Sequence, residues 1–211
     1  TPGNAIFTVE NTTRSGQWVL HIGQIKSGKL RTGDAVDTRV EATRHSSIKS
    51  NHTATHLLNN ALRSIVGEHC DQRGSLVAPD RLRFDYAAHD APTTEQLASI
   101  ENAVRANITA GLPVDAAELS LDVAQGVNGV RAIFGERYPD PVRVVCVGAA
   151  VADLAATPQA DTWATLSTEF CGGTHTGNTS EIGDFVIMQE SSLAAGIRRF
   201  MAATGAEAAK A

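Results

Sequence analysis

Long apolar runs, paired cysteines and an excess of basic residues are all lacking in this 211-residue chain. No apolar stretch approaches the roughly 20 residues that span a bilayer and no signal peptide is visible, so a membrane is not an expected partner. The three cysteines, Cys70, Cys146 and Cys171, are an odd number, which argues against a disulfide framework and favours a reducing, cytoplasmic compartment. With 18 basic against 23 acidic residues, binding of DNA or RNA through charge alone is not expected.

The composition, 42% hydrophobic and 19% charged, predicts a folded chain with a sizeable core. Because the chain begins at Thr1 rather than at a methionine, we expect it to be part of a longer or processed protein. Short alternating segments separated by glycine turns predict strands at 5–9, 17–22 and 35–40. The predicted organisation is a small β-barrel-like module at 1–43, a larger domain at 44–206 and a tail at 207–211.

From about residue 46 the apolar spacing becomes helical, and Gly67 is the expected end of this helix. The arc opposite the apolar stripe holds His52, His56, Asn59 and Arg63, so we expect both histidines to point away from the main core. Further along, the sequence predicts hairpin strands at 72–77 and 82–86, helices from Thr93 or Thr94 and at 120–125, strands at 142–147 and 185–189, and a strand or short helix at 197–203. The Ala-rich stretch 148–166 is expected to be a surface insertion. The larger domain is therefore predicted to be α+β, with helices packed on a mostly antiparallel sheet.

Two pairs of metal-ligand residue types share a spacing of four. His52 and His56 lie one helical turn apart, close enough to chelate one metal ion. Cys171 and His175 flank Gly-Gly-Thr, where we expect positive-φ glycines to aim both side chains at one point. Together the two pairs suit a tetrahedral Zn²⁺ site.

Each half has an alternative reading when it is considered separately. The histidines can be two solvent-facing side chains, and the second pair can be a glycine turn beside a buried cysteine, or a Cys–His nucleophilic dyad. Four protein ligands close a zinc site, so a catalytic role requires one ligand to give way, and Cys171 is our candidate. Thr53 stands where a zinc peptidase of the helical His-x-x-x-His type carries its glutamate base, which disfavours that activity.

Other polar residues are weaker candidates. Gln72 and Ser75 flank Gly74 at the start of a predicted strand and can face the metal pocket, although by the residues alone turn chemistry explains them better. Arg198, next to Arg199, can bind phosphate or can be a solvated surface residue. The carboxylates that can orient a ligand imidazole are Glu169, Glu181 and Asp184, and the sequence does not rank them.

The motifs, in this order, resemble the editing domain of the alanyl-tRNA synthetase family. The resemblance covers nearly the whole chain, and the segments that carry it are Asn51-His-Thr-Ala-Thr-His-Leu-Leu, Gly74-Ser-Leu-Val, Leu82-Arg-Phe-Asp, Ser167-Thr-Glu-Phe-Cys-Gly-Gly-Thr-His and Ala195-Gly-Ile-Arg-Arg. The editing region of threonyl-tRNA synthetase is a more distant likeness, because its cysteine-bearing loop differs. The fold implied is the second additional domain type of these synthetases.

The resemblance implies hydrolysis of the ester that joins serine or glycine to the 3′ end of tRNA(Ala). It also implies zinc bound by His52, His56, Cys171 and His175, and a polar pocket position at Gln72 with Thr53 and Thr55 beside the ligands. The implied partners are the acceptor end of tRNA(Ala) and the remaining domains of the synthetase. A non-catalytic, zinc-stabilised module that positions tRNA is the alternative, and it predicts zinc-dependent stability without deacylation.

Overall fold

The computed structural model describes residues 5–133 and 135–211, which divide into two compact units between Val40 and Glu41. The boundary expected between residues 43 and 44 falls in the first turn of helix α1 (Ala42–Ile65). The tail expected at 207–211 includes the end of the short helix α5 (Gly205–Ala208), where Ala208 is buried. Among the described residues, no helix has both the length and the apolar character needed to cross a membrane.

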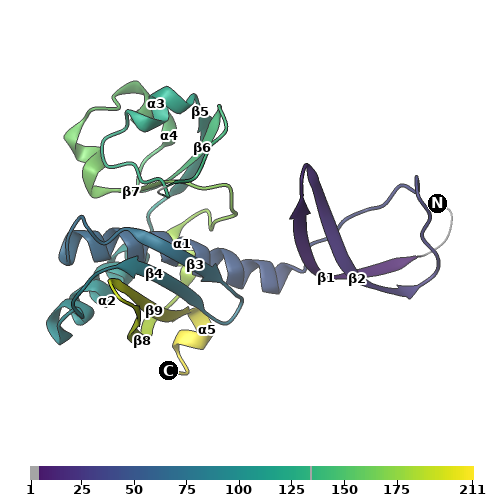
Figure 1. Cartoon of the computed structure of the whole chain (residues 1–211), viewed down its shortest axis with the longest axis horizontal. Helices are drawn as coiled ribbons and strands as arrows, with labels where there is room; N and C mark the ends of the chain where they lie inside the picture. Colours follow the sequence, from purple (N-terminus) through teal and green to yellow (C-terminus); the bar gives the residue numbers. More distant parts are fainter. Residues whose placement is uncertain (1–4, 134) are drawn as a thin grey trace. The chain divides into compact units, whose positions relative to one another are not determined.

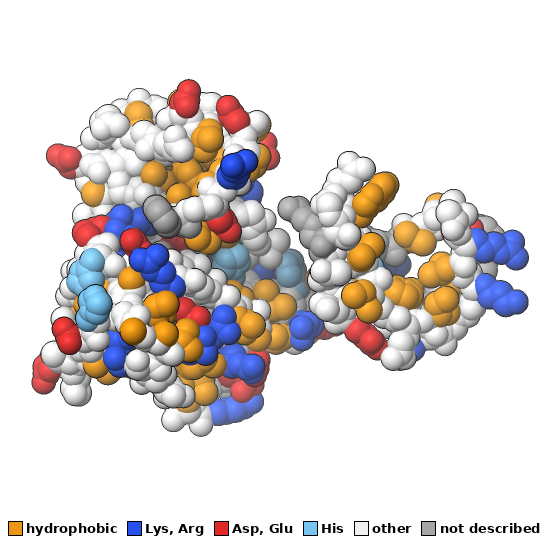
Figure 2. All heavy atoms as spheres, viewed as in Figure 1, with side chains coloured by type: hydrophobic (Ala, Val, Ile, Leu, Met, Phe, Trp, Pro, Cys, Tyr) orange, Lys and Arg blue, Asp and Glu red, His pale blue; other side chains and the backbone are white. Residues whose placement is uncertain are grey.

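The first unit is built on one antiparallel hairpin of strands β1 (Ile6–Ser15) and β2 (Trp18–Ser27), joined at Gly16, which has a positive φ. The third strand predicted at 35–40 is wrong, because within the described residues this segment pairs with no strand, and Val36 and Val40 are 63% and 71% exposed. The described part of the unit therefore shows a two-stranded sheet rather than a closed barrel. Apolar side chains are exposed along the hairpin (Figure 2), among them Trp18, Val19, Ile22 and Ile25.

Helix α1 organises the second unit. Its N-terminus is capped by the Glu41 carboxylate, which accepts hydrogen bonds from the Thr43 and Arg44 amides, so the helix begins earlier than the apolar spacing predicts. It ends at Ile65, and Gly67 follows with a φ of +140°. One face carries Leu58 and Leu62 into a hydrophobic core, whereas the opposite face is buried against a different part of the unit.

The first core of this unit lies between two helices and a four-stranded antiparallel sheet of order β3-β4-β9-β8 (Figure 1). The strands are β3 (Gln72–Val77), β4 (Leu82–Ala87), β8 (Phe185–Ala194) and β9 (Ile197–Thr204). Helix α2 (Thr94–Thr109) begins with the predicted capping box of Thr93 and Gln96. The predicted hairpin and α2 are confirmed, and residues 197–203 form a strand rather than a helix.

A second core lies under a separate antiparallel sheet of order β5-β6-β7 (Figure 1), so the second unit has two sheets where the sequence predicted one. Its strands are β5 (Val114–Leu119), β6 (Val142–Val147) and β7 (Ser167–Phe170). The strand at 142–147 and the helix near 120–125, α3 (Leu121–Gln125), are confirmed. The sheets and helices together make the second unit an α+β fold.

The segment 148–166 lies mostly at the surface, as expected, but it is not an insertion separate from the core. The segment forms helix α4 (Val151–Ala156) and the 3₁₀ helix η1 (Asp161–Thr165). Val151 and Leu154 are fully buried in the second core. Val151 and Leu154 are spaced by three residues, so both side chains lie on one helical face. The surrounding alanines make this apolar face difficult to recognise in the sequence.

Candidate metal centre

His52 and His56 lie on the face of α1 that is turned away from the first core, as the helical spacing predicts. This face is nevertheless buried, because β7 and the loop after it pack against it, and His56 is only 3% exposed. The Ser167 hydroxyl at the start of β7 donates a hydrogen bond to the His56 carbonyl at 3.2 Å. The helix therefore presents both imidazoles to the space between α1 and the β7 segment.

Cys171 and His175 lie on the loop that follows β7. The Arg143 side chain, from β6, donates hydrogen bonds to the carbonyls of Cys171 and Gly173 at 2.7 and 2.8 Å. The expectation of positive-φ glycines is wrong, since neither Gly172 nor Gly173 has a positive φ. The requirement at Gly173 is space, because a Cβ atom there would lie 2.2 Å from Cε1 of His52.

The structure brings the four predicted ligands together. One ligand atom from each of His52, His56, Cys171 and His175 lies within 4.8 Å of the others, and Sγ of Cys171 is 3.4 Å from Nε2 of His52. A tetrahedral zinc ion with nitrogen and sulfur ligands holds its donor atoms roughly 3.3 to 3.6 Å apart. The four side chains thus need only a small contraction to bind one ion.

Hydrogen bonds on the outer side of two imidazoles leave the inner nitrogens free for a metal. Nδ1 of His52 lies 3.2 Å from the carbonyl of Thr174, which can only accept, so Nδ1 carries the proton and Nε2 does not. Nδ1 of His175 lies 3.2 Å from the hydroxyl of Thr53, whose own proton is donated to the Lys49 carbonyl. Such partners of metal-binding histidines fix the tautomer and the ring orientation.

Two buried imidazole nitrogens of the cluster lack any hydrogen-bond partner among the described residues. Nδ1 of His56 and Nε2 of His175 are buried and make no hydrogen bond within the described structure. A buried nitrogen without a partner costs free energy, which metal coordination removes. The residues present therefore fit a bound metal ion.

Burial sets the protonation of the cluster. It lowers the pKa of His52, lowers that of His56 well below the usual range and lowers that of His175 to about 3, and the neighbouring imidazoles and Arg143 add repulsion. Burial raises the pKa of the Cys171 thiol. Neutral imidazoles with free lone pairs are the form that binds a metal ion.

Glu169 is the carboxylate that reaches the cluster. Its Oε2 lies 3.7 Å from Nε2 of His56, and its Oε1 accepts a hydrogen bond from the Asn59 amide at 2.9 Å. Burial raises the pKa of Glu169 to about 7. The other two candidates lie elsewhere, since Glu181 accepts from the Asn178 amide and Asp184 pairs with Arg105.

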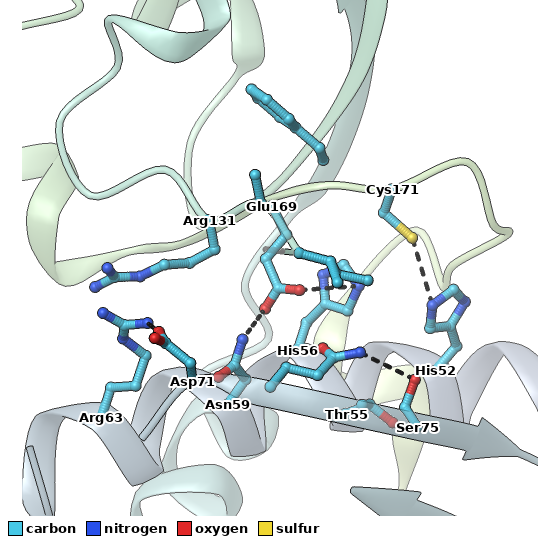
Figure 3. A pocket seen from close by; sticks show the side chains of 14 residues that line it. His52, Thr55, His56, Asn59, Arg63, Asp71, Ser75, Arg131, Glu169 and Cys171 are labelled. Carbon is cyan, nitrogen blue, oxygen red and sulfur yellow. Dashed lines mark hydrogen bonds and ion pairs between the residues drawn. The ribbon is translucent and has the colours of Figure 1, made fainter. Parts of the chain in front are cut away.

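A cavity of about 400 Å³ opens beside the cluster (Figure 3). His52, His56 and Cys171 line one part of it, whereas His175 is absent from its lining. The predicted pocket residues Thr55, Gln72 and Ser75 also line it, and the Gln72 amide donates to the Ser75 hydroxyl at 3.2 Å.

Two predicted substrate-binding residues are not brought to this cavity. Thr53 is fully buried behind His175 and also accepts a hydrogen bond from the Thr176 amide at 3.1 Å. Arg198 is held by both carboxylate oxygens of Glu190, each at 2.6 Å. Their placement gives Thr53 a role in orienting His175 and commits Arg198 to an ion pair.

Several lining residues were not proposed as functional from the sequence. Asn59 and Arg63 share the helical arc of the two histidines, and this shared arc is a signal that could have identified them. Arg131 comes from the connection between α3 and β6, where no motif marks it. The Arg143 contacts with the cysteine loop likewise had no signal in the sequence.

Comparison with known proteins shows which family this chain resembles in sequence. Residues 142–200 match the family described as the threonyl and alanyl tRNA synthetase second additional domain. The chain is 47% identical over 204 residues to the mitochondrial alanine–tRNA ligase of Saccharomyces cerevisiae, an alignment that covers 97% of this chain and 21% of the yeast protein. The cytoplasmic alanine–tRNA ligase of Bombyx mori is 47% identical over 205 residues, with 97% and 21% covered.

A bacterial relative gives the same alignment. The alanine–tRNA ligase of Halorhodospira halophila is 43% identical over 203 residues, which cover 96% of this chain and 21% of that protein. The chain thus spans about one fifth of the length of the relatives that it matches. Along nearly its whole length, therefore, this chain belongs to the alanyl-tRNA synthetase family and corresponds to the segment that contains the second additional domain.

Proposed function

We propose that this chain is an editing deacylase that hydrolyses the ester joining serine or glycine to the 3′ end of tRNA(Ala). The observation that carries the proposal is the cavity that opens onto the cluster of His52, His56 and Cys171, in a chain related to alanine–tRNA ligases. A binding pocket prefers one amino acid over another that differs by a single small group by only ~10–200-fold. An enzyme that must select alanine over serine and glycine therefore needs a second, hydrolytic site.

The proposal includes Zn²⁺ as the metal, held by His52, His56, Cys171 and His175. When bound, zinc supplies a positive charge that polarises oxygen atoms beside it. Cys171 lines the cavity whereas His175 does not, so Cys171 is the loop ligand that a substrate can reach. We assign Cys171 to the reacting centre on this basis, together with Gln72, whose side chain lines the same cavity.

The pocket hydroxyls supply selectivity in this proposal. Thr55 donates its proton to the Asn51 carbonyl at 2.8 Å, so toward the cavity its oxygen can accept a hydrogen bond but cannot donate one. The hydroxyl of an esterified serine is such a donor, and Ser75 lies on the same cavity wall. An alanyl ester lacks the hydroxyl and leaves this polar group unpaired, which disfavours its binding.

The ligase activity of the whole enzyme, its tRNA and its other domains also belong to the proposal. We propose that the chain acts as part of an alanine–tRNA ligase and works on the acceptor end of tRNA(Ala). The cytoplasmic setting is supported by relatives named cytoplasmic in Bombyx mori and Dictyostelium discoideum, although the yeast relative is named mitochondrial.

The test is the release of labelled serine from Ser-tRNA(Ala) by the purified chain, with Ala-tRNA(Ala) as the control substrate. We expect faster loss of serine than of alanine, and we expect Cys171→Ala to abolish the release while the fold remains. Cys70→Ala is the matched control, because Cys70 is a buried cysteine of the first core outside the cavity. A Cys171→Ala variant that deacylates at the wild-type rate would remove Cys171 from the site.

The same preparation tests the ligand set and the alternative function. His52→Ala should lose zinc affinity, and full zinc occupancy in that variant would contradict the proposed ligands. Bound zinc without release of either amino acid would refute the deacylase and support a zinc-stabilised module that positions tRNA.

A further inference from the structure

The cavity has a second charged end, which the editing chemistry above leaves unexplained. Figure 3 shows Arg63 and Arg131 side by side, with Asn59 and Glu169 between them and the cluster of His52 and Cys171. Arg63 comes from α1, about two turns beyond His56, and Arg131 reaches in from the opposite wall. Their side chains are only 10% and 25% exposed.

The acidic partners of these arginines are far more exposed. Arg63 binds the Asp71 carboxylate at 2.9 Å and also contacts Glu68, and Arg131 binds Glu68 at 2.9 Å. The side chains of Asp71 and Glu68 are 53% and 72% exposed, and Asp71 lines the cavity whereas Glu68 does not. The pair of Arg131 with Glu68 is largely solvated and contributes little stability, so its exchange for another anion costs little.

Both guanidinium groups keep hydrogen-bond donors unused. An arginine carries five N–H donors. Nε of Arg63 is buried and has no hydrogen-bond partner, and the contacts of Arg131 with carboxylates use Nη2 alone within the described residues. Two neighbouring arginines with spare donors form a typical site for phosphate oxygens.

The two ends of the cavity match the two ends of an aminoacylated nucleotide. Such a nucleotide carries the amino acid ester on one side of its ribose and the 5′-phosphate on the other. The cavity volume of about 400 Å³ lies within the range of small-molecule sites. A phosphate at the arginine end therefore directs the ester toward the histidine–cysteine end.

We propose that Arg63 and Arg131 bind the 5′-phosphate of the terminal nucleotide and position its aminoacyl ester at the metal centre. The proposal rests on the proposed function for the identity of the nucleotide. Both are positioning residues, since they hold the phosphate and do not touch the reacting ester. The alternative is that the two arginines only tie the end of α1 to the segment around residue 131 through Glu68.

Binding of a non-hydrolysable ligand separates these readings. The probe is 3′-deoxy-3′-(serylamino)adenosine, in which an amide replaces the ester, prepared with and without a 5′-methylphosphate that carries the single charge of a tRNA phosphodiester. Calorimetry on the full zinc-loaded chain should show a preference of roughly tenfold or more for the phosphorylated probe, as two charge-assisted contacts predict.

The variants test whether the preference comes from these side chains. In Arg131→Gln and in Arg63→Gln/Arg131→Gln the preference should fall toward unity, while affinity for the unphosphorylated probe stays within about twofold. Arg105→Gln is the matched control, because Arg105 also pairs with two carboxylates, Glu101 at 3.0 Å and Asp184 at 3.4 Å, and lies outside the cavity. It removes the same charge and should keep the preference.

The outcomes distinguish this proposal from the editing activity. A wild-type chain without phosphate preference, or variants that retain the preference, overturns the phosphate site whether or not seryl esters are hydrolysed. A preference that depends on Arg131, found in a chain that does not hydrolyse seryl esters, upholds the phosphate site and refutes the deacylase. Arg131→Gln alone keeps the test valid if the double variant fails to fold, since the ion pair of the Arg131 side chain within the described residues is with the exposed Glu68.

Discussion

The helix that carries His52 and His56 and the loop that carries Cys171 and His175 differ in what fixes their conformation. Helix α1 has a continuous backbone hydrogen-bond ladder and is buried on two faces, one against the first core and one against β7. The loop has neither a helical hydrogen-bond ladder nor an apolar core of its own, and its path is fixed by hydrogen bonds from Arg143, by those with Thr53 and by the close approach of Gly173 to the His52 ring. Each such hydrogen bond contributes about 1 kcal/mol. We therefore expect the helix to form without metal, whereas the loop depends on side-chain hydrogen bonds and on the four ligands meeting at one ion.

Removal of the metal should act on the loop and spare the helix, and this is the largest effect that we expect. After chelation, the amides of Cys171 and Thr176, which donate to the Arg143 carbonyl and to Thr53, should exchange with solvent roughly tenfold faster or more. The amides of Leu58 and Leu62 in α1 should keep their protection. Hydrogen exchange followed by mass spectrometry, with and without the chelator, measures both regions in one sample.

Readdition of Zn²⁺ is the control for this experiment and should restore the slow exchange of the loop. Equal acceleration in α1 and the loop would show that the metal stabilises the whole unit and that the helix is not preformed. Unchanged exchange of the loop would contradict its dependence on the metal.

Gly173→Ala should create a steric clash between the cysteine loop and the His52 ring of helix α1. The new Cβ atom would meet Cε1 of His52 at 2.2 Å and Nδ1 at 2.7 Å, so the imidazole must leave its position and its hydrogen bond to the Thr174 carbonyl. We expect zinc affinity to fall roughly 100-fold, as loss of orientation of one ligand predicts. Competition with a chromophoric chelator measures the change.

Gly172→Ala is the matched control at the neighbouring position. A Cβ atom there has no neighbour within 4 Å, and the backbone φ is not positive, so the same change in composition meets no obstacle. Its zinc affinity should stay close to that of the unchanged chain. Equal affinities of the two variants would show that the contact of Gly173 with His52 is not needed.

The same comparison explains which parts of the site could be predicted from the sequence. The helical spacing places His52 and His56 on one face, because the period of an α-helix is fixed. The motif around Cys171 indicates the ligand types, but the reason for its second glycine lies in the His52 ring, 121 residues earlier in the chain. Contacts of this kind, like those of Arg143 and Arg131, leave no periodic pattern in the sequence.

The two cores of the second unit also differ in how much of each could be predicted from the sequence. The hairpin of β3 and β4 and the helix α2 were predictable from alternation, turns and a capping box. In the second core, β7 has only four residues and β5 has no fully buried residue, so neither strand has a pattern long enough to detect. The segment 35–40 is the reverse case, since it has an alternating pattern but no partner strand among the described residues.

Thr53 connects the two halves, and its replacement should have the smallest of these effects. In Thr53→Val the side chain keeps its shape but loses the oxygen that faces Nδ1 of His175 and accepts from the Thr176 amide, which is itself buried. We expect about a tenfold loss of zinc affinity and about 1 to 3 kcal/mol lower stability, because a buried amide is left unpaired. Thr53→Ser retains the hydroxyl and should restore most of the zinc affinity, whereas a purely packing role would make Val the better replacement. Full zinc affinity in Thr53→Val would mean that the loop orients His175 without help from the helix. The proposal that the loop depends on contacts with a preformed helix would then be contradicted.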